Sequence, residues 1–106
     1  GLLPPMIQKP DVFLVMGGDK ARNLMLGLGS ALRRVGILTD YPIKSVGFNK
    51  QFKLSNQSGA RVAAIMGDEE ASTKTLKIKD LSSGKEVSVA FGDAVPMIER
   101  VLSEGL

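Results

Sequence analysis

The sequence has 106 residues and contains neither cysteine nor histidine. The absence of cysteine excludes disulfide bonds, thiolate metal sites and a cysteine nucleophile, so nothing in the chain reports the redox state of its compartment. The absence of histidine removes the most common general base, the usual catalytic triad and most transition-metal sites. Both absences count against an independent small enzyme and favour a binding domain.

Long apolar runs are also missing. The continuous runs at 12–16 and 62–66 are about five residues long, whereas a helix needs about 20 to cross a bilayer. The opening residues Gly-Leu-Leu-Pro-Pro lack the charged start and the long apolar stretch of a signal peptide. We therefore expect a soluble domain at residues 11–106, preceded at 1–10 by a linker or fragment edge.

Positive charge is concentrated in the first part of the chain. The net charge is +3, but residues 1–60 carry eight Lys or Arg against three acids, whereas residues 61–106 carry six against eight. Between Asp40 and Asp68 every charged side chain is positive. Such a stretch attracts phosphate groups, although a solvated basic helix face would have the same composition.

The first two thirds of the chain alternate between strand-like and helix-like patterns. Residues 11–16 form an apolar run typical of a buried strand, and Asp19 in the following turn is a candidate helix cap. Apolar residues then recur every three or four positions up to Gly36, a residue typical of a helix end. The same reasoning predicts, in order, a strand at 37–43, a helix from Ser45 to Gly59 and a strand at 61–66.

The last third of the chain has a different pattern. Residues 75–80 and 86–91 alternate apolar and polar side chains around a turn at 82–84, which predicts an antiparallel hairpin. Asp93 is a candidate cap for a final helix with Pro96 in its first turn. Strands separated by helices form right-handed crossovers with parallel strands. The sequence therefore predicts a single α/β domain with three layers, α/β/α, and a five-stranded mixed sheet in the order β-α-β-α-β-β-β-α.

Four segments of the chain are characteristic when taken in order: DVFLVM, ARNLMLGLGSALRRVGI, FNKQFKLSNQSGARVAAIMGDEE and TLKIKDLSSGKEVSV, with KQFK, GAR, GDEE and KDL as the most specific motifs. These segments resemble the anticodon-binding domain of class IIa aminoacyl-tRNA synthetases. The resemblance covers Asp11 to Glu104, and among the subfamilies the chain is most similar to the C-terminal domain of histidyl-tRNA synthetases. It implies an anticodon-binding-domain fold and the anticodon loop of a tRNA as partner.

The acidic run Asp68-Glu69-Glu70 allows three interpretations. A calcium site needs six or more oxygen ligands from spaced acids, and this run is one short cluster. A surface salt bridge from Glu70 to Lys77 or Lys79 would stabilise the fold by about 0–1 kcal/mol. The third interpretation is that these acidic and basic side chains contact RNA bases.

The resemblance implies base contacts by Glu70, the second acid of the family's G-x-x-E pattern, and by Lys79, nine residues later. A carboxylate accepts two hydrogen bonds from N1–H and N2–H₂ of guanine, and a lysine donates to O6, N7 or phosphate. The histidine anticodon contains two guanines, which fits a guanine-reading carboxylate. We include Lys77 among the expected RNA contacts. Some relatives have arginine at the position of Lys79, so a two-point contact would become a single-point one.

Five other side chains and two glycines complete the list of residues considered. Lys50 and Lys53 are expected phosphate contacts, with ordinary solvated lysines as the alternative. Tyr41 is a candidate for base stacking because the proline that follows it suggests a strand end. Phe48 and Phe52 are one helical turn apart, a spacing that favours core packing over stacking on bases. The glycines Gly27 and Gly29 are expected to let their helix pack closely on the sheet.

The resemblance also implies a functional context. It implies that the domain supplies tRNA affinity and identity to a histidine–tRNA ligase whose separate catalytic domain uses ATP and magnesium. We expect no cofactor or metal in this domain, no membrane contact, a homodimeric parent and a cytoplasmic location, with an organelle as the other possibility. The alternative is a tRNA-sensing or dimerisation module of a regulatory protein such as a stress-responsive kinase.

Overall fold

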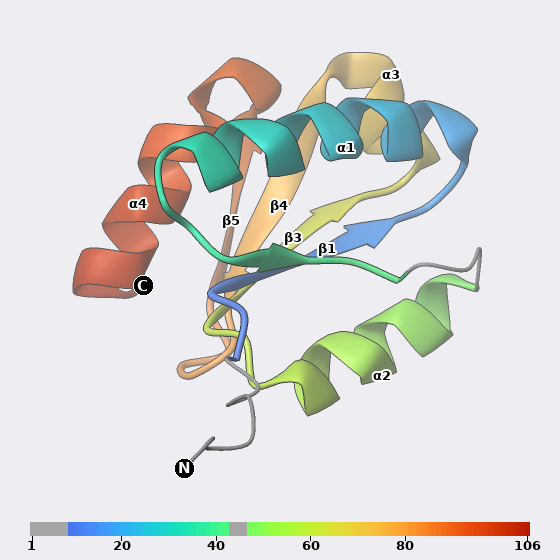
Figure 1. The fold of residues 1–106 in the computed structure, drawn as a ribbon. Coiled ribbons are helices and arrows are strands. Elements are labelled where there is room, and N and C mark those ends of the chain that lie inside the picture. Colours follow the sequence, from blue (N-terminus) through green and yellow to red (C-terminus); the bar gives the residue numbers. More distant parts are fainter. Residues whose placement is uncertain (1–8, 43–46) are drawn as a thin grey trace, which may run out of the picture.

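The computed structural model describes residues 9–42 and 47–106, which form a five-stranded sheet between two layers of helices (Figure 1). The elements are β1 (Val12–Met16), α1 (Asp19–Arg34), β2 (Thr39–Asp40), α2 (Phe48–Ser58), β3 (Val62–Met66), α3 (Asp68–Thr73), β4 (Thr75–Asp80), β5 (Glu86–Ala90), the 3₁₀ helix η1 (Phe91–Asp93) and α4 (Ala94–Glu104). The strand order is β2-β1-β3-β4-β5. β1 is parallel to β2 and β3, and β4 is antiparallel to β3 and β5, so the predicted mixed sheet is confirmed.

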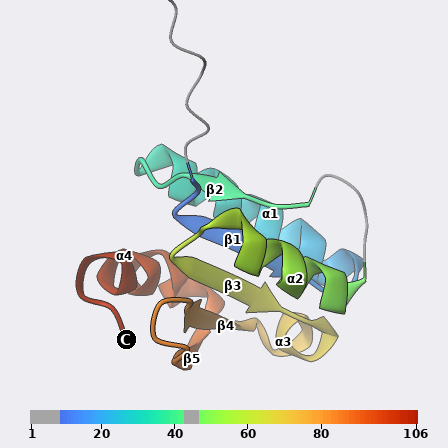
Figure 2. The same ribbon diagram turned by 90° about the horizontal axis from the view of Figure 1, so that it is seen from below.

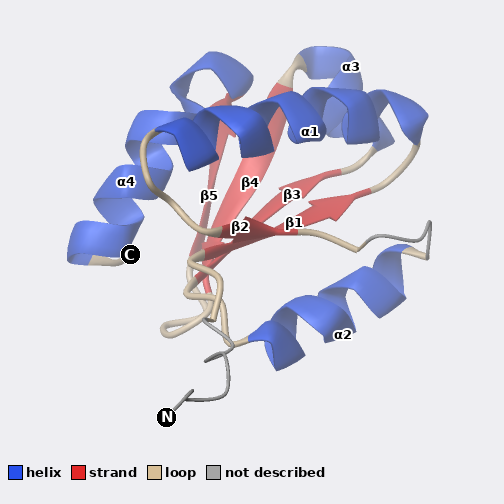
Figure 3. Ribbon diagram, viewed as in Figure 1, coloured by secondary structure: helices blue, strands red, loops and turns tan. Residues whose placement is uncertain are grey.

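The sheet separates two apolar cores because successive side chains of a strand point to opposite faces. Val12, Leu14 and Met16 belong to the larger core, which contains residues of α1, α3 and α4. Phe13 and Val15 belong to a smaller core with residues of α2. Of the described helices, α2 is the only one on that face (Figures 2 and 3), so the three-layer prediction is confirmed. No helix in the described ranges is long and apolar enough to cross a membrane.

α1 follows the predicted helical pattern with one change at its start. The N-cap residue is Gly18, which makes no side-chain cap hydrogen bond, so the prediction of Asp19 as the cap is wrong. As an acid in the first turn, Asp19 still interacts favourably with the positive end of the helix dipole. Gly36 has φ +85° just after the helix, as predicted for a helix end. The buried residues of α1 are Ala21, Met25, Leu28, Gly29 and Leu32.

The two glycines inside α1 have different surroundings. A Cβ at Gly29 would lie 3.3 Å from Cδ1 of Leu14, so this glycine does allow α1 to approach β1 closely. A Cβ at Gly27 would meet nothing within 4 Å. The packing prediction is therefore confirmed for Gly29 and wrong for Gly27, which lies on the exposed face of the helix.

The second strand and the second helix differ from their predicted bounds. β2 contains only Thr39 and Asp40, instead of the predicted 37–43. α2 begins at Phe48 with Gly47 as its N-cap, and the predicted cap Ser45 lies outside the described residues. A two-residue strand leaves most of β1 without a strand partner on that side.

The side chain of Gln51 on α2 takes the place of the missing part of β2. In β1, the N–H of Val12 donates to the carbonyl of Leu38 at 3.0 Å, so by the strand period the N–H of Met16 points to the same side. The Met16 N–H donates to Oε1 of Gln51 at 2.7 Å, and Nε2 of Gln51 donates to the Met16 carbonyl at 2.6 Å. The buried Gln51 amide thus satisfies two backbone groups and fixes α2 to the end of β1.

The C-terminal hairpin and helix match the prediction closely. β4 has the predicted bounds with Leu76 and Ile78 buried, whereas β5 ends one residue early, at Ala90. A 3₁₀ turn then leads into α4, whose residues Ile98 and Val101 are buried. Asp93 is the N-cap of α4 but makes no side-chain cap hydrogen bond. The hairpin and α4 complete the larger core.

α3 is an element that the sequence reasoning missed. The acids that were expected in a turn form a six-residue helix, so the order is β-α-β-α-β-α-β-β-α. Only Ala71 of this helix is buried, and a helix of one and a half turns with one buried residue has no apolar period to detect. It ends at Lys74, which has a left-handed conformation with φ +54°.

Candidate nucleic-acid interface

The carboxyl ends of β1 and β3 meet the first turn of α2 at one edge of the molecule, which we call the rim. It consists of Gly17, Gly18, Gly67 and Phe48, and it lies on the right in Figure 1. The Gly17 N–H donates to the carbonyl of Met66 at 2.9 Å. The helices α1 and α2 lie on opposite faces of the sheet here, the arrangement that in open α/β sheets produces a ligand-binding crevice.

Gly18 is required at the rim by its conformation and its neighbour. Its φ of +95° is in the region that favours glycine. A Cβ at this position would clash with a carboxylate oxygen of Asp68, the first residue of α3. The turn after β1 and the start of α3 are therefore in direct contact.

Glu70 lies at the rim and has no ionic partner among the described residues. The residue is half-buried, and its Oε2 lies 3.4 Å from where a Cβ of Gly67 would be. Within the described residues, the ion pairs closer than 4.0 Å are Arg61–Asp80 and Arg100–Glu104. The interpretation of Glu70 as part of a surface salt bridge with Lys77 or Lys79 is therefore wrong.

Glu70 and Lys77 line the same hollow, whereas Lys79 lies farther away. The hollow has a volume of about 440 Å³ between α3 and the start of β4. Lys79 is on the same face of β4 as Lys77 but about 7 Å farther along the strand, half-buried and paired across the sheet with Glu86. The hollow is lined by Glu69, Glu70, Ser72, Thr73, Thr75 and Lys77.

Four of the lysines predicted to contact RNA are on the α2 side of the sheet. Lys50 and Lys53 are exposed on α2 itself. Lys77 and Lys79 pair with Ile65 and Ala63 of β3, whose side chains belong to the core beneath α2. We call these four lysines the basic face.

Tyr41 is placed apart from the other candidates. The Arg33 guanidinium lies over its ring, with Cζ 5.5 Å from the ring centroid, and the ring packs against the larger core. Arg33 is in the last turn of α1, while the first turn of that helix is at the rim. A 16-residue helix is about 24 Å long, so Tyr41 and Glu70 are in different parts of the molecule.

The metal interpretation of the acidic run finds no geometric support. The described part of the chain contains no group of three or more Asp, Glu, His or Cys residues placed to hold a metal ion. Asp68 contacts the Gly18 turn, whereas Glu70 lies beside Gly67. The first and third acids of the run are therefore held by different neighbours.

One feature of the rim and one of the fold were not found from the sequence. Phe48, expected in the core, is 36% exposed at the rim.

Asp80, which had no assigned role, lies at the other end of the sheet, paired with Val62 at the start of β3. It is buried and joins three segments by accepting hydrogen bonds from Arg61 Nε, Ser82 Oγ and the Leu106 N–H at 3.1, 2.7 and 3.0 Å. Arg61, and then Ser82 and Leu106, hold the pKa of the Asp80 carboxyl well below its usual range. Arg61 and Asp80 belong to the GAR and KDL motifs, but the motifs did not predict that the two side chains pair.

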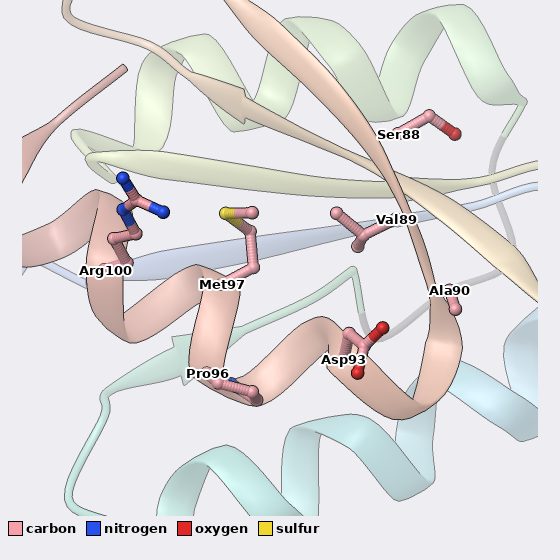
Figure 4. Close-up of a pocket in the computed structure, with 7 residues that line it drawn as sticks. All are labelled: Ser88, Val89, Ala90, Asp93, Pro96, Met97 and Arg100. Carbon is pink, nitrogen blue, oxygen red and sulfur yellow. The ribbon is translucent and has the colours of Figure 1, made fainter.

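A second hollow lies between β5 and α4, with a volume of about 550 Å³ (Figure 4). None of the residues predicted to bind RNA lines it. Its Arg100 already pairs with Glu104, through Nε and Oε2 at 3.2 Å. The lining residues are Ser88, Val89, Ala90, Asp93, Pro96, Met97 and Arg100.

Comparison with curated proteins finds histidine–tRNA ligases over nearly the whole chain. The ligase of Opitutus terrae is 42% identical over 103 residues, which are 97% of this chain and 24% of the ligase. The ligase of Pyrococcus abyssi is 30% identical over 104 residues, 98% of this chain and 24% of the ligase. The chain thus spans 24% of the length of each of these two relatives.

Solved structures and a family model agree with this comparison. A histidyl-tRNA synthetase structure from Nostoc sp. PCC 7120 has a TM-score of 0.78 and 29% identity, covering 90% of this chain and 23% of that one. The apo structure from S. aureus has a TM-score of 0.78 and 23% identity, covering 92% of this chain and 28% of that one, and supports the same fold. The family model for the anticodon binding domain matches residues 11–101. Because that match covers most of its length, the chain belongs to the anticodon-binding domain family.

Proposed function

We propose that this chain recognises the anticodon loop of a tRNA as one domain of a histidyl-tRNA synthetase. The similarity to histidine–tRNA ligases over 97% of the chain supports the choice of synthetase. The observation that carries the proposal is the position of Glu70, which lies half-buried at the rim, has no ionic partner within residues 9–42 and 47–106, and shares a hollow with Lys77. Attachment of histidine, with ATP and magnesium, would be the task of another part of such a synthetase.

The chemistry of Glu70 and its neighbours suits guanine. A carboxylate accepts hydrogen bonds from N1–H and N2–H₂ at the same time, and no other standard base presents this pair of donors. The ammonium group of Lys77 donates to O6, N7 or a phosphate of the same loop. Lys79, farther along the strand, is assigned to an adjacent nucleotide.

The exposed lysines of α2 are assigned to the RNA backbone. Lys50 and Lys53 are on the same side of the sheet as Lys77 and Lys79, so one RNA strand can pass along all four. Contacts to phosphate position an RNA without reading its sequence. Tyr41 is left out of the proposed site because its ring packs against Arg33 and the larger core.

The proposal is tested by binding of anticodon stem-loops that carry either the histidine anticodon or adenine at each guanine position. For Glu70→Gln we expect a preference for guanine that is smaller by about 5- to 150-fold, since one base contact contributes about 1–3 kcal/mol of discrimination. Glu99→Gln, an exposed acid on α4, has the same change in charge and should leave the preference unchanged. Lys50→Ala should weaken all stem-loops by the same factor.

One outcome would contradict the assignment of Glu70. If Glu70→Gln weakened the guanine and adenine stem-loops equally, the carboxylate would have no part in reading the base. If the unsubstituted chain did not prefer the histidine anticodon over a scrambled loop, the proposed function itself would be wrong.

The wider assembly is part of the same proposal. We infer that the domain works beside a catalytic domain, in a homodimeric synthetase of the cytoplasm. The alternative, a tRNA-sensing or dimerisation module of a regulatory protein, has no counterpart among the histidine–tRNA ligases described above. Class II synthetase motifs in the same open reading frame would support the synthetase, and a kinase domain would support the alternative.

A further inference from the structure

Phe48 is an exposed aromatic residue at the rim. It is the first residue of α2 and is 36% exposed, whereas Phe52, one turn later, packs against the core beneath the helix. The other exposed large apolar residues of the described chain, Val35 and Leu38, lie between α1 and β2, away from the rim. Exposure of one side chain is ordinary in itself, but the ring of Phe48 is also held in a fixed position by its neighbours.

The ring of Phe48 rests on the backbone of two glycines. Its Cδ1 and Cε1 each lie 3.5 Å from where a Cβ of Gly17 would be, and Cε2 lies 3.8 Å from the corresponding point at Gly67. A side chain larger than alanine at either glycine would occupy the space of the ring. The ring of Phe52 supports it from a third direction in an edge-to-face contact, with centroids 5.0 Å apart and an angle of 61°.

The turn that carries Phe48 is also fixed. Gln51, three residues later, makes the two hydrogen bonds to Met16 at 2.7 and 2.6 Å. The ring is therefore held in place before any ligand arrives, and a preorganised side chain loses little conformational entropy on binding. An exposed aromatic ring with a fixed orientation is what proteins use to stack an unpaired base.

Glu70 and Phe48 share the same glycine. Oε2 of Glu70 lies 3.4 Å and Cε2 of Phe48 lies 3.8 Å from the Cβ position of Gly67. A base stacked on the ring extends its hydrogen-bonding edge beyond the margin of the ring. The carboxylate lies close to that margin, so one base can make both contacts.

The space beside the ring has room for one base or one sugar-phosphate group. A hollow of about 200 Å³ opens between the turn after β1 and the start of α2, which is smaller than the 300–1,000 Å³ typical of drug-sized ligands. Arg22, in the first turn of α1, is the basic residue among the described ones that line this hollow. The hollow is lined by Met16, Gly17, Gly18, Asp19, Arg22, Gly47, Phe48 and Gln51.

We propose that Phe48 stacks on an anticodon base and that this base is the same purine whose edge Glu70 reads. This inference rests on the proposed function, because it assigns a second contact to the same site. It divides the recognition of one nucleotide into stacking by the ring, which tolerates any base, and hydrogen bonding by the carboxylate, which selects guanine.

The stacking contact is tested by equilibrium binding of the 106-residue chain to the histidine anticodon stem-loop. We expect Phe48→Leu to lower the affinity by roughly 5- to 150-fold, because stacking of one base contributes about 1–3 kcal/mol. Phe48→Tyr keeps the ring and should bind within about twofold of the unsubstituted chain. Leu38→Ala removes an exposed apolar side chain elsewhere and should have no effect. Thermal unfolding of each variant separates loss of binding from loss of fold.

The shared base is tested with stem-loops that lack a base at one anticodon position. Removing the purine that Glu70 discriminates should weaken binding to the unsubstituted chain, and Phe48→Leu should then cause no further loss. If Phe48→Leu still weakens binding to that abasic loop, the two residues act on different bases and the shared-base part is wrong.

The failure of this inference is distinct from the failure of the proposed function. If the chain prefers the histidine anticodon but Phe48→Leu binds as tightly as the unsubstituted chain, the stacking role is overturned and the proposed function stands. If Phe48→Leu does not fold, the stacking role is still tested by Phe48→Tyr and by binding of abasic stem-loops to the unsubstituted chain. Equal binding of abasic and intact loops by the unsubstituted chain would also overturn the stacking role.

Discussion

At the scale of single residues, Asp80 connects more of the chain than any other side chain described above. It ends β4, and it accepts hydrogen bonds from Arg61 before β3, from Ser82 in the hairpin turn and from Leu106 after α4. The carboxylate is buried, while the Arg61 side chain is 41% exposed. Because the donors favour the charged form, the folded chain binds a proton at Asp80 less readily than the unfolded chain does.

Asp80 should therefore make the stability of the fold dependent on acid. Its pKa in the folded chain lies below the ordinary value of 3.8, so its contribution is fully present above about pH 4 and is lost as the pH falls further. We expect Asp80→Asn to lower the free energy of unfolding by about 1–3 kcal/mol at pH 7. It should also make the decline between pH 4 and pH 2.5 shallower than in the unsubstituted chain.

Urea denaturation at a series of pH values measures both effects. Glu104→Gln, which removes the acid of an exposed ion pair, is the matched control and should change stability by less than about 1 kcal/mol at any pH. Parallel pH curves for Asp80→Asn and the unsubstituted chain would show that the Asp80 carboxylate does not contribute to acid sensitivity.

The residues of the candidate site could be predicted from the sequence more reliably than the surroundings of their side chains in the fold. The acid and lysine of the site, Glu70 and Lys77, were both predicted from the sequence, and the structure brings them to one hollow. The surroundings of two aromatic rings differ from those expected, since Arg33 lies over the ring of Tyr41 and the ring of Phe48, expected in the core, is exposed. Helical spacing places Phe48 on the inner face of α2, but it does not reveal that the sheet beneath ends in two glycines.

At the scale of elements, α2 is attached to the sheet by a few apolar contacts and by the hydrogen bonds of one buried polar side chain. Apart from the apolar contacts of Phe52 and Leu54, the buried residues of this helix are the polar Gln51 and Ser55. Gln51 satisfies the N–H and the carbonyl of Met16 where β2 has already ended. Without that amide, both backbone groups would be buried without these partners.

We expect Gln51→Leu to lower the free energy of unfolding by about 2–6 kcal/mol, because it leaves two buried backbone groups without these partners and each costs about 1–3 kcal/mol. Gln57→Leu makes the same change at an exposed position of the same helix and should stay within about 0.5 kcal/mol. Urea denaturation of the two variants gives the comparison. Equal stability of the two would mean that the hydrogen bonds to Met16 contribute nothing to the fold.

Elements were predictable where they bury a long periodic face. β1, β3, β4, α1 and α4 were found close to their observed bounds because each buries several apolar residues. β2 and α3 were misjudged because one pairs through only two residues and the other buries only Ala71. In both, contacts made by distant parts of the chain decide the structure, and local sequence does not record them.

At the scale of the whole molecule, the basic face gives the domain one side that is rich in lysine. Lys50, Lys53, Lys77 and Lys79 are all on the α2 side of the sheet, and no ion pair closer than 4.0 Å involves any of them within the described residues. Lys50 and Lys53 come from the basic first part of the chain, whereas Lys77 and Lys79 come from the second part, so the fold brings together lysines that are far apart in the sequence. This side leads to the rim, where Glu70 and Phe48 are located.

The basic face should make tRNA binding depend on salt. For single-stranded RNA the logarithm of affinity falls with the logarithm of salt concentration by about 0.7 for each phosphate contact. We expect Lys53→Ala to reduce that slope by about 0.7 and to weaken histidine and non-histidine anticodon loops equally. Lys85→Ala, in the exposed hairpin turn, should leave the slope unchanged. A change in anticodon preference for Lys53→Ala would contradict a contact to phosphate alone.

In the short helix α3, the side chain proposed to contact RNA and the side chain that packs in the core are different residues. The helix carries the acid that we assign to the anticodon, yet it contributes one buried side chain, Ala71, to the interior. If Glu70 reads the anticodon as proposed, exchanging the solvent-facing residues of α3 would alter the preferred base while the interior stays as it is. The selectivity of the domain would then change through a few substitutions in one short helix.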